Sequence, residues 1–524
     1  MIGGGAAGIA IALRLAGAGL TVLMFESGGM EPSAEGEALA EGSHSGLPYF
    51  ELNESRVRAF GGSTFRWGAR SAPVRPIDFE QRNWVSLSGW PFGPEELAPY
   101  HSSVAELIGL RMPFDFGAGV FKHMRRLPPT FDASLVDVAA FQFGKNLIFG
   151  ESFAREIQAV KNVKAYLNAC VTQIVLSGDR RRAQSVRIET LNGKKFTAKA
   201  RAFILAAGGI ENPRLLLNWD DGAGKTLCNS SGLVGRCFME HPTLTAGAVR
   251  TQDQNAVADI FSPGLVDGRF VETGLTPSPQ RQRSEKILNA VACARLVVSA
   301  DATQALREII WNAKHRKIPM NLQWYKNEWL RERVMAILRD PLSIPLNILR
   351  HMLGRPKRFK ADSVVLEVRS EQAPNPDSRI TLSDTKDAFG LRRAHLHWEM
   401  TKLEKRTMRE TATLFDRELR RLNLGAVEFS DWIKTDELVW SDDMVGGHHH
   451  MGTTRMSVNP SEGVVDPDCK AHDLDNLYIA GCSVFPTSSF VNPTFTMLCL
   501  AQRLADHLKA RLLREKSAAG AYAA

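Results

Sequence analysis

Residues 1–29 read MIGGGAAGIAIALRLAGAGLTVLMFESGG, and this stretch decides the fold. Gly3, Gly5 and Gly8 form a G-x-G-x-x-G fingerprint at the start of a helical run that extends to about Ala18. Glycines at this spacing allow a tight turn and let the backbone approach a pyrophosphate, whose charge is favoured at a helix N-terminus. The stretch therefore predicts a dinucleotide-binding unit.

The residues on either side of this helix complete most of the unit. A β-rich run from Leu20 to Phe25 is followed by Glu26, whose carboxylate is suited to hydrogen-bonding a ribose hydroxyl. Only Met1 and Ile2 precede the fingerprint, whereas a central parallel strand usually has about five residues. We therefore expect an upstream segment to be missing and the first strand to be short.

Further along the chain, a second strand–glycine–helix unit and then a β-rich region are predicted. FILAA at 203–207 is a buried-strand pattern that ends at a glycine pair, and the helical pattern ENPRLLLNW follows at 211–219. Between about 242 and 440, alternating runs such as SVVLEVRS (363–370) and RRAHLHW (392–398) predict an antiparallel sheet.

These patterns predict an α/β protein with a doubly wound dinucleotide-binding domain that is discontinuous in sequence. An α+β substrate domain, built on the antiparallel sheet, is inserted into it. We place the first domain in residues 1–90, 150–241 and 440–524, and the substrate domain in residues 91–149 and 242–439.

The C-terminal part of the chain contains the residues best suited to catalysis. His449 precedes a Gly-Thr turn, and Asn492 with Pro493 opens an apolar helix about forty residues later. An imidazole and an amide that converge can take the proton of an alcohol and hold its oxygen. Asn492 could alternatively serve as a helix cap, since asparagine is favoured there.

The run of three histidines also raises the question of a metal site. In an extended segment His448 and His450 point to one face and His449 to the other, so three neighbours do not readily ligate one metal. We predict no metal, with His449 as the base and His450 as the alternative. His241 and His472 are interpreted as structural histidines.

Composition excludes several classes of protein. With 524 residues and 44% hydrophobic content, the chain can bury large cores and form two interleaved domains. The seven cysteines contain no C-x-x-C, so neither a disulfide framework nor a zinc ribbon is indicated. No apolar run reaches the roughly 20 residues of a membrane span, and no signal peptide is visible. We expect a cytoplasmic protein.

The formal net charge of +8 is concentrated between residues 307 and 360. This stretch mixes Trp, Leu and Ile with Lys and Arg at loosely helical spacing, which predicts a basic helical insertion. It is either a solvated helical region packed on the body or an amphipathic surface for a membrane, an accessory subunit, a second copy or an electron-transfer partner. Nothing resembles a nucleic-acid-binding module.

Six segments in order resemble the glucose–methanol–choline (GMC) family of FAD-dependent oxidoreductases. Beside the N-terminal fingerprint and the C-terminal block, they are GGSTFRWG (61–68), ILAAGGIENPRLLL (204–217), GLVGRCFMEHP (232–242) and NPDSRITLS (375–383). The elements H-x-x-G-T at His449 and N-P-T-x-T at Asn492 are most similar to the sugar-oxidising branch. That branch includes pyranose oxidase, bacterial glycoside 3-oxidases and FAD-dependent sugar dehydrogenases.

The resemblance implies a role for each matching position. Gly3, Gly5 and Gly8 would approach the FAD diphosphate, Glu26 would bind the adenosine ribose, Gly62 and Ser63 would lie along the diphosphate and flavin, and Val171 would contact adenine. Ala207, Gly481, Asn492 and Thr494 are the remaining cofactor-binding positions. Pyranose oxidase tethers its flavin through a histidine in a motif like 61–68, where this chain has Phe65-Arg66-Trp67. A non-covalent FAD is therefore expected.

The resemblance also implies a reaction. A secondary hydroxyl of a sugar or glycoside would be oxidised to the ketone, with hydride passing from carbon to flavin N5, His449 as base and Asn492 as hydrogen-bond donor. The polar stretches 252–259 and 321–329 favour a sugar over a sterol or aliphatic alcohol. Oxygen, a quinone or a redox protein would accept the electrons. The alternatives are oxidation of a non-sugar alcohol, a flavoprotein subunit of an electron-transfer complex, and a protein in which FAD is only structural.

Overall fold

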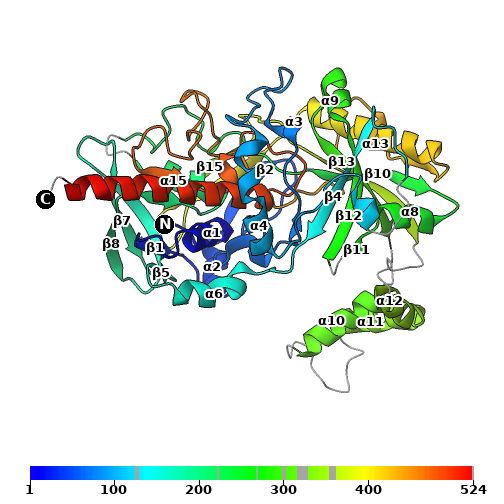
Figure 1. Cartoon of the computed structure of the whole chain (residues 1–524), viewed down its shortest axis with the longest axis horizontal. Coiled ribbons are helices and arrows are strands. Elements are labelled where there is room, and N and C mark those ends of the chain that lie inside the picture. Colours follow the sequence, from blue (N-terminus) through cyan, green and yellow to red (C-terminus); the bar gives the residue numbers. More distant parts are fainter. Residues whose placement is uncertain are drawn as a thin grey trace.

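The computed structural model describes residues 1–123, 129–220, 224–266, 269–297, 302–314, 328–352 and 362–521 (Figure 1). Its strands fall into a parallel sheet, a large antiparallel sheet and two three-stranded sheets. The parallel and antiparallel sheets lie on opposite sides of the body in Figure 1. This is the α/β fold with an added antiparallel sheet that the sequence predicts. The domain boundaries themselves stay a prediction.

The parallel sheet is assembled from segments that are far apart in the chain. Strands β1 (Val22–Phe25) and β5 (Val163–Tyr166) pair in parallel, as do β9 (Phe203–Leu205) and β18 (Leu477–Ile479). Ile2 joins the two pairs, because it bridges Phe25 on one side and Leu205 on the other, both in parallel. The strand before the glycine fingerprint is thus very short, as expected.

Helix α1 (Ala6–Arg14) follows this strand and packs against α15 (Thr494–Ala521) and α6 (Phe149–Ala159). Its residues from Ala7 to Ala12 are all buried, because neighbours cover the helix on several sides. A helix that is apolar around much of its circumference needs such cover. The packing fixes the N-terminal end of α1 at the edge of the parallel sheet.

Two small sheets flank this core. Strands β6 (Cys170–Leu176), β7 (Ala183–Glu189) and β8 (Lys195–Lys199) form an antiparallel meander. Strand β16 (Arg392–Trp398) pairs with β15 (Arg379–Lys386) in antiparallel and with β2 (Gly42–Gly46) in parallel. The run RRAHLHW is therefore a strand, as its alternation predicts, but it belongs to this mixed sheet and not to the large antiparallel one. Alternation reports one buried face and does not specify the partner strand.

Within the described residues the large antiparallel sheet has eight strands, with α13 (Lys402–Arg421) packed against it. In order across the sheet these are β17 (Ala426–Phe429), β10 (Thr243–Arg250), β14 (Ser363–Ser370), β13 (Ala290–Val297), β12 (Arg269–Pro277), β4 (Val136–Phe143) and β3 (Arg70–Ser71), with β11 (Gly264–Val266) paired to β12. Strand β3 directly follows the predicted cofactor-binding segment 61–68, so this segment leads from a cavity to the antiparallel sheet.

Three helices occupy much of the predicted basic insertion: α10 (Ala302–Lys314), α11 (Glu328–Arg339) and α12 (Ser343–Met352). They pack on one another and lie apart from the rest of the molecule in Figure 1. Residues 315–327 and 353–361 of this insertion lie outside the described residues. Across the described ranges, none of the helices has the length and apolar character needed to cross a membrane.

The remaining helices connect these layers. They are α2 (Ala34–Ala40), α3 (Pro76–Phe79), α4 (His101–Ile108), α5 (Val120–His123), α7 (Glu211–Asn218), α8 (Gln254–Phe261), α9 (Pro279–Glu285) and α14 (Asp431–Lys434).

Candidate active site

A cavity of about 340 Å³ lies at the carboxyl ends of the parallel strands, where open α/β sheets bind ligands. The cavity is lined by most of the residues that the sequence assigns to cofactor or substrate: Gly3, Gly5, Glu26, Gly62, Ser63, Val171, Ala207, His449, Gly481, Asn492 and Thr494. Gly8 does not line it. A Cβ added there would lie 2.4 Å from the carbonyl oxygen of Gly3, so this glycine serves the packing of α1.

Neither the backbone conformation nor the packing of the protein requires a glycine at position 5. Gly5 has a φ of −76°, which any residue adopts, and a Cβ added there would meet nothing nearer than the Cα of Gly62 at 3.9 Å. It immediately precedes α1, whose first amides have no side-chain cap. A side chain would project into the cavity at the end of the helix that favours anions. The open space suits a bound phosphate group.

Glu26 lies beside this turn and is 6% exposed. Its Oε2 accepts a hydrogen bond from the amide of Gly4 at 2.7 Å, and its Oε1 accepts one from the amide of Gly28 at 2.9 Å. Burial raises the pKa of its carboxyl group. Glu26 thus ties the fingerprint loop to the end of β1 while lining the cavity.

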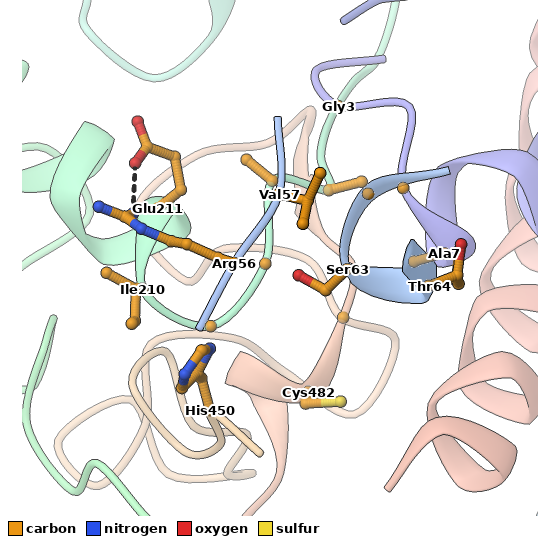
Figure 2. Close-up of a pocket in the computed structure, with 18 of the residues that line it drawn as sticks. Gly3, Ala7, Arg56, Val57, Ser63, Thr64, Ile210, Glu211, His450 and Cys482 are labelled. Carbon is orange, nitrogen blue, oxygen red and sulfur yellow. Dashed lines mark hydrogen bonds and ion pairs between the residues drawn. The ribbon is translucent and has the colours of Figure 1, made fainter. Parts of the chain in front are cut away.

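An arginine cluster that the sequence did not reveal surrounds Glu211 on the opposite wall, and Figure 2 shows the ion pair between Glu211 and Arg56. Glu211 forms ion pairs with Arg56 at 2.9 Å, Arg58 at 2.8 Å and Arg214 at 2.6 Å. Burial alone would raise the pKa of Glu211, but the three guanidinium groups outweigh it and hold the pKa below its ordinary value. The cluster joins the loop before the GGSTFRWG segment (61–68) to α7.

At the other end of the cavity, His449 contacts a second histidine. His241 Nε2 lies 3.1 Å from the carbonyl oxygen of Ser488, which can only accept, so Nε2 carries the proton. Burial and the nearby Arg369 lower the pKa of His241 to about 3, so its ring is neutral and Nδ1 is an acceptor. The Nδ1 of His449, at 2.8 Å, must therefore donate, which leaves the lone pair of its ring on Nε2.

Asn492 faces this lone pair. Its Oδ1 accepts hydrogen bonds from Arg70 at 3.0 Å and from Arg369 at 3.2 Å, which orients the amide. Its Nδ2 then lies 3.2 Å from His449 Nε2 and donates to it. The bonds of the Asn492 side chain within the described structure go to these three residues and not to the amides of α15, so the geometry does not support the cap interpretation.

A buried carboxylate holds the His449 segment in place. Glu240, which is 0% exposed, accepts hydrogen bonds from the backbone amide of His449 at 2.9 Å and from the hydroxyl of Tyr49 at 2.6 Å. A Cβ added at Gly447 would lie 2.5 Å from Nδ1 of His449. The position of the imidazole therefore depends on glycine at 447 and on the carboxylate at 240.

The environment keeps His449 neutral. Burial, and then the neighbouring His241 and Arg369, lower the pKa of His449 well below its ordinary value of 6.5. A neutral imidazole with its lone pair directed at the cavity is competent as a general base near neutral pH.

The adjacent histidines have separate environments. His448 has a φ of +57°, so the segment is not simply extended, and its ring stacks on Phe50 at 4.0 Å. His450 lines the cavity, and its Nε2 is buried without a hydrogen-bond partner in the described structure. Among the residues that the structure describes, no group of His, Cys, Asp or Glu is arranged to hold a metal ion. His472 bonds locally, to the backbone carbonyl of Ser457.

Comparison with known proteins identifies the architecture. Residues 153–243 and 374–501 match the N-terminal and C-terminal models of the GMC oxidoreductase family. The chain is a GMC oxidoreductase. It thus acts on CH–OH groups and uses FAD. The GMC models cover β6, β7, β9 and α7 at the cofactor end and the segment with His449 and Asn492 at the catalytic end.

Several GMC relatives resemble most of the chain at low identity. The 2-methyl-1,2-propanediol dehydrogenase of Mycolicibacterium austroafricanum is 25% identical, covering 86% of this chain and 80% of its own. The fructose dehydrogenase large subunit of Gluconobacter japonicus is 22% identical over the same shares. The C-glycoside 3-oxidase of Arthrobacter globiformis is 26% identical, covering 65% of this chain and 70% of its own.

Among solved structures, pyridoxine 4-oxidase from Mesorbium loti aligns with a TM-score of 0.59 at 16% identity. The alignment covers 97% of this chain and 98% of that one. At this identity the likeness supports the fold alone.

The residues present fit FAD. The side-chain-free surface at Gly5 and the uncapped start of α1 can receive a diphosphate, and Glu26 can accept hydrogen bonds from a ribose. The cavity continues from there to His449 and Asn492, so one ligand can extend from the fingerprint to the catalytic end. Sequence reasoning missed the site roles of four residues: His241, Glu240, Arg70 and Arg369. Of these, His241 had a local signal, because it lies in the motif at 232–242.

Proposed function

We propose that this chain oxidises a secondary hydroxyl of a sugar or glycoside to the ketone, with His449 as the base. The observation that carries the proposal is the convergence of His449 Nε2 and Asn492 Nδ2, 3.2 Å apart, at one end of the cofactor cavity. The contact of His449 with His241 leaves Nε2 unprotonated, so Nε2 can accept the proton of a substrate hydroxyl that takes the place of its contact with Asn492.

These two side chains divide the work on the hydroxyl group. His449 Nε2 removes its proton, and Asn492 Nδ2 donates a hydrogen bond to the oxygen, where negative charge develops. Arg70 and Arg369 keep the amide of Asn492 oriented for this donation. FAD, when bound, supplies the acceptor for the hydride that leaves the carbon. Loss of one proton and one hydride converts the alcohol to a carbonyl.

The polarity of the catalytic end supports a sugar. His449, Asn492, Arg70 and Arg369 all line it, and several convergent polar groups suit a polyhydroxylated substrate. The fructose dehydrogenase large subunit and C-glycoside 3-oxidase are relatives named for sugar substrates. The sequence had pointed to other stretches. Residues 252–259 mostly belong to α8 and do not line the cavity, and residues 321–327 lie outside the described residues.

The experiment that tests the proposal is anaerobic reduction of the FAD-loaded protein. The reduction is measured as the loss of the visible flavin band. Free sugars, O- and C-glycosides, simple alcohols and 1,2-diols would be added in turn. We expect at least one sugar or glycoside to bleach the band, and His449→Ala to slow the bleaching. Bleaching by diols or long-chain alcohols with none by sugars would contradict the sugar proposal and leave the family assignment intact.

We further propose that FAD is held without a covalent bond. Pyranose oxidase tethers its flavin through a histidine in a motif that resembles residues 61–68. This chain has Phe65-Arg66-Trp67 there and no histidine. Acid precipitation should release the flavin into the supernatant. Flavin that stays with the precipitated protein would contradict this, and the histidines and Cys482 that line the cavity would then be the attachment candidates.

A second candidate function is a flavoprotein subunit that passes electrons to a quinone or a redox protein through the helices α10–α12. Residues 302–360 contain 13 Lys and Arg against 4 Asp and Glu, whereas the rest of the chain contains 52 and 53. Leu338 on α11, Leu342 in the turn that follows it and Met352 on α12 are 65%, 79% and 77% exposed. Exposed apolar side chains on a basic helical unit are typical of a docking surface.

This candidate is tested by separating the two half-reactions. A double variant that carries Leu338→Ser and Leu342→Ser should pass electrons from the substrate to a soluble dye as fast as the wild type. Reduction of ubiquinone in vesicles that contain anionic lipid should fall. The control is Val458→Ser, since Val458 is 68% exposed on the body of the molecule. Equal ubiquinone reduction by both variants would contradict a docking role for these helices.

A further inference from the structure

A cluster of three arginines and two glutamates lies beside the catalytic end of the cavity, and Arg70 and Arg369 of this cluster line the cavity. Arg70 pairs with Glu272 at 2.6 Å, and Arg295 pairs with the other oxygen of Glu272 and with Glu367 at 3.2 Å. Glu272 is 1% exposed and has both oxygens engaged. Arg369 is the third guanidinium of this group. No described carboxylate lies within 4.0 Å of it.

Arg369 projects from β14 toward the cavity. Its Nε donates to the hydroxyl of Thr243 at 3.3 Å and one terminal nitrogen donates to Asn492 Oδ1 at 3.2 Å. Neither partner carries charge, and its other terminal nitrogen makes no hydrogen bond within the described structure. Burial and the neighbouring Arg70 lower the pKa of Arg369 to about 10, so it remains a cation at neutral pH. A poorly solvated cation without a counter-ion is costly unless a ligand supplies the charge.

We propose that Arg369 binds an anionic group of the substrate, so that the chain oxidises an acidic sugar that bears a carboxylate or phosphate. This inference rests on the proposed sugar oxidation and adds the charge of the substrate to it. A guanidinium whose second terminal nitrogen has no hydrogen bond in the described structure can donate to either anion. Arg70 is less suited to the role, because Glu272 already neutralises it and its guanidinium lies over the ring of Phe141.

The geometry also limits where the anion sits relative to the reacting hydroxyl. One amide, that of Asn492, contacts Arg369 through its oxygen and His449 through its nitrogen. The anion-binding arginine and the base are therefore separated by one small side chain. A substrate that reaches both has its anionic group on a carbon close to the one that is oxidised.

Binding of small anions tests the site without assuming the substrate. Acetate and inorganic phosphate would be titrated into the FAD-loaded protein, and binding would be followed by the absorbance change of the flavin. Arg369→Met should raise the Kd of the anion by about 10- to 100-fold, the loss expected for a charged hydrogen bond. Arg369→Lys keeps the charge and should lie between. The control is Arg250→Met, since Arg250 is an exposed arginine that pairs with Glu428 at the far end of β10. An unchanged Kd in Arg369→Met would overturn the inference.

Reduction of the flavin by matched substrates then identifies the anion. Methyl glucuronide, methyl glucoside 6-phosphate and methyl glucoside present the same ring with a carboxylate, a phosphate or neither. A lower Kd for one acid than for the glucoside, lost in Arg369→Met, would support the inference and name the group. A wild-type preference for the neutral glucoside over both acids would overturn it. That second result would leave the proposed sugar oxidation standing, so the two failures are distinguishable.

Discussion

The Nδ1 atoms of His241 and His449 lie 2.8 Å apart, and this contact determines which nitrogen of His449 is basic. The carbonyl of Ser488 requires the proton of His241 on Nε2, and His241 in turn requires a proton on Nδ1 of His449. His241 does not reach the lone pair that acts on the substrate. It is a positioning residue that selects a tautomer, as the hydrogen-bond partners behind many reactive histidines do.

Replacing His241 tests this role. In His241→Leu no acceptor faces His449 Nδ1, so both tautomers become accessible and the rate constant for flavin reduction should fall by about 10- to 100-fold. His241→Asn places an amide oxygen near the position of Nδ1 and should recover most of the rate. A purely structural role would show the same loss in both variants, accompanied by loss of bound FAD. Single-turnover rates and flavin content measure the two outcomes.

Replacing the base tests the assignment of His449. His449→Ala should lower the rate constant for flavin reduction by about 10²- to 10⁴-fold, the usual contribution of general base catalysis, while flavin content stays near that of the wild type. His472→Ala is the matched control, because the ring of His472 bonds to the backbone of Ser457, away from the cavity. Near-normal reduction in His449→Ala would show that another group is the base, with His450 the first to examine.

The pH dependence of the reaction follows from the lowered pKa of His449. A depressed pKa keeps the imidazole neutral through weakly acidic pH, so the rate constant at saturating substrate should stay flat from about pH 8 to below 6.5 and fall only at lower pH. Arg369 lowers this pKa as a nearby positive charge. Arg369→Met should therefore move the acid limb upward, toward 6.5. A limb that stays in place would show that burial and the neighbouring histidines set the pKa of His449 without Arg369.

The sequence predicted the site residues that belong to short motifs. It did not predict those that tertiary contacts bring in from distant parts of the chain. The Gly3–Gly8 fingerprint, Glu26, His449 and Asn492 were found because each sits in a short motif whose spacing has a physical meaning. All except Gly8 line the cavity. Arg369 carries no such local signal. It reaches Asn492 only because β14 pairs with β10 and the C-terminal segment crosses beside them.

The same limit explains His241 and the fold. His241 and His449 are 208 positions apart, and their contact depends on how the segment before β10 meets the segment before the Gly-Thr turn. Local alternation likewise predicted β14 and β16 as strands but placed both in one sheet. The pairing of β16 with β2 joins residues about 350 positions apart, and no pattern within either strand encodes it.

Burial of neutral histidines should also make stability depend on pH. Burial and the nearby Arg56 lower the pKa of His450 to about 3, whereas in the unfolded chain it is near 6.5. The unfolded state therefore binds more protons between those values, and the free energy of unfolding falls as the pH drops below 6.5. Since His450 Nε2 has no partner within the described structure, His450→Phe should fold.

Between about pH 7 and pH 5, the free energy of unfolding should fall in both proteins. The fall should be smaller in His450→Phe than in the wild type by up to about 2 kcal/mol. Urea unfolding at the two pH values, on FAD-loaded protein, measures the difference. The same pH dependence in both proteins would show that His450 is protonated at similar pH in its folded and unfolded states.

The two glycines at the start of the fingerprint should fail in different ways. Gly5 has an ordinary φ and open space where a Cβ would lie, so Gly5→Val should leave the fold intact and block the cofactor. Gly3 has a φ of +107°, and a Cβ there would lie 2.5 Å from the carbonyl oxygen of Ala206, so Gly3→Val should destabilise the parallel sheet itself. Flavin content and urea unfolding of the FAD-free proteins separate the two effects. We expect Gly5→Val to lose FAD while its unfolding midpoint matches that of FAD-free wild type, and Gly3→Val to lose both. If Gly5→Val bound FAD normally, the diphosphate would have to lie elsewhere in the cavity, and the role assigned to the start of α1 would be wrong.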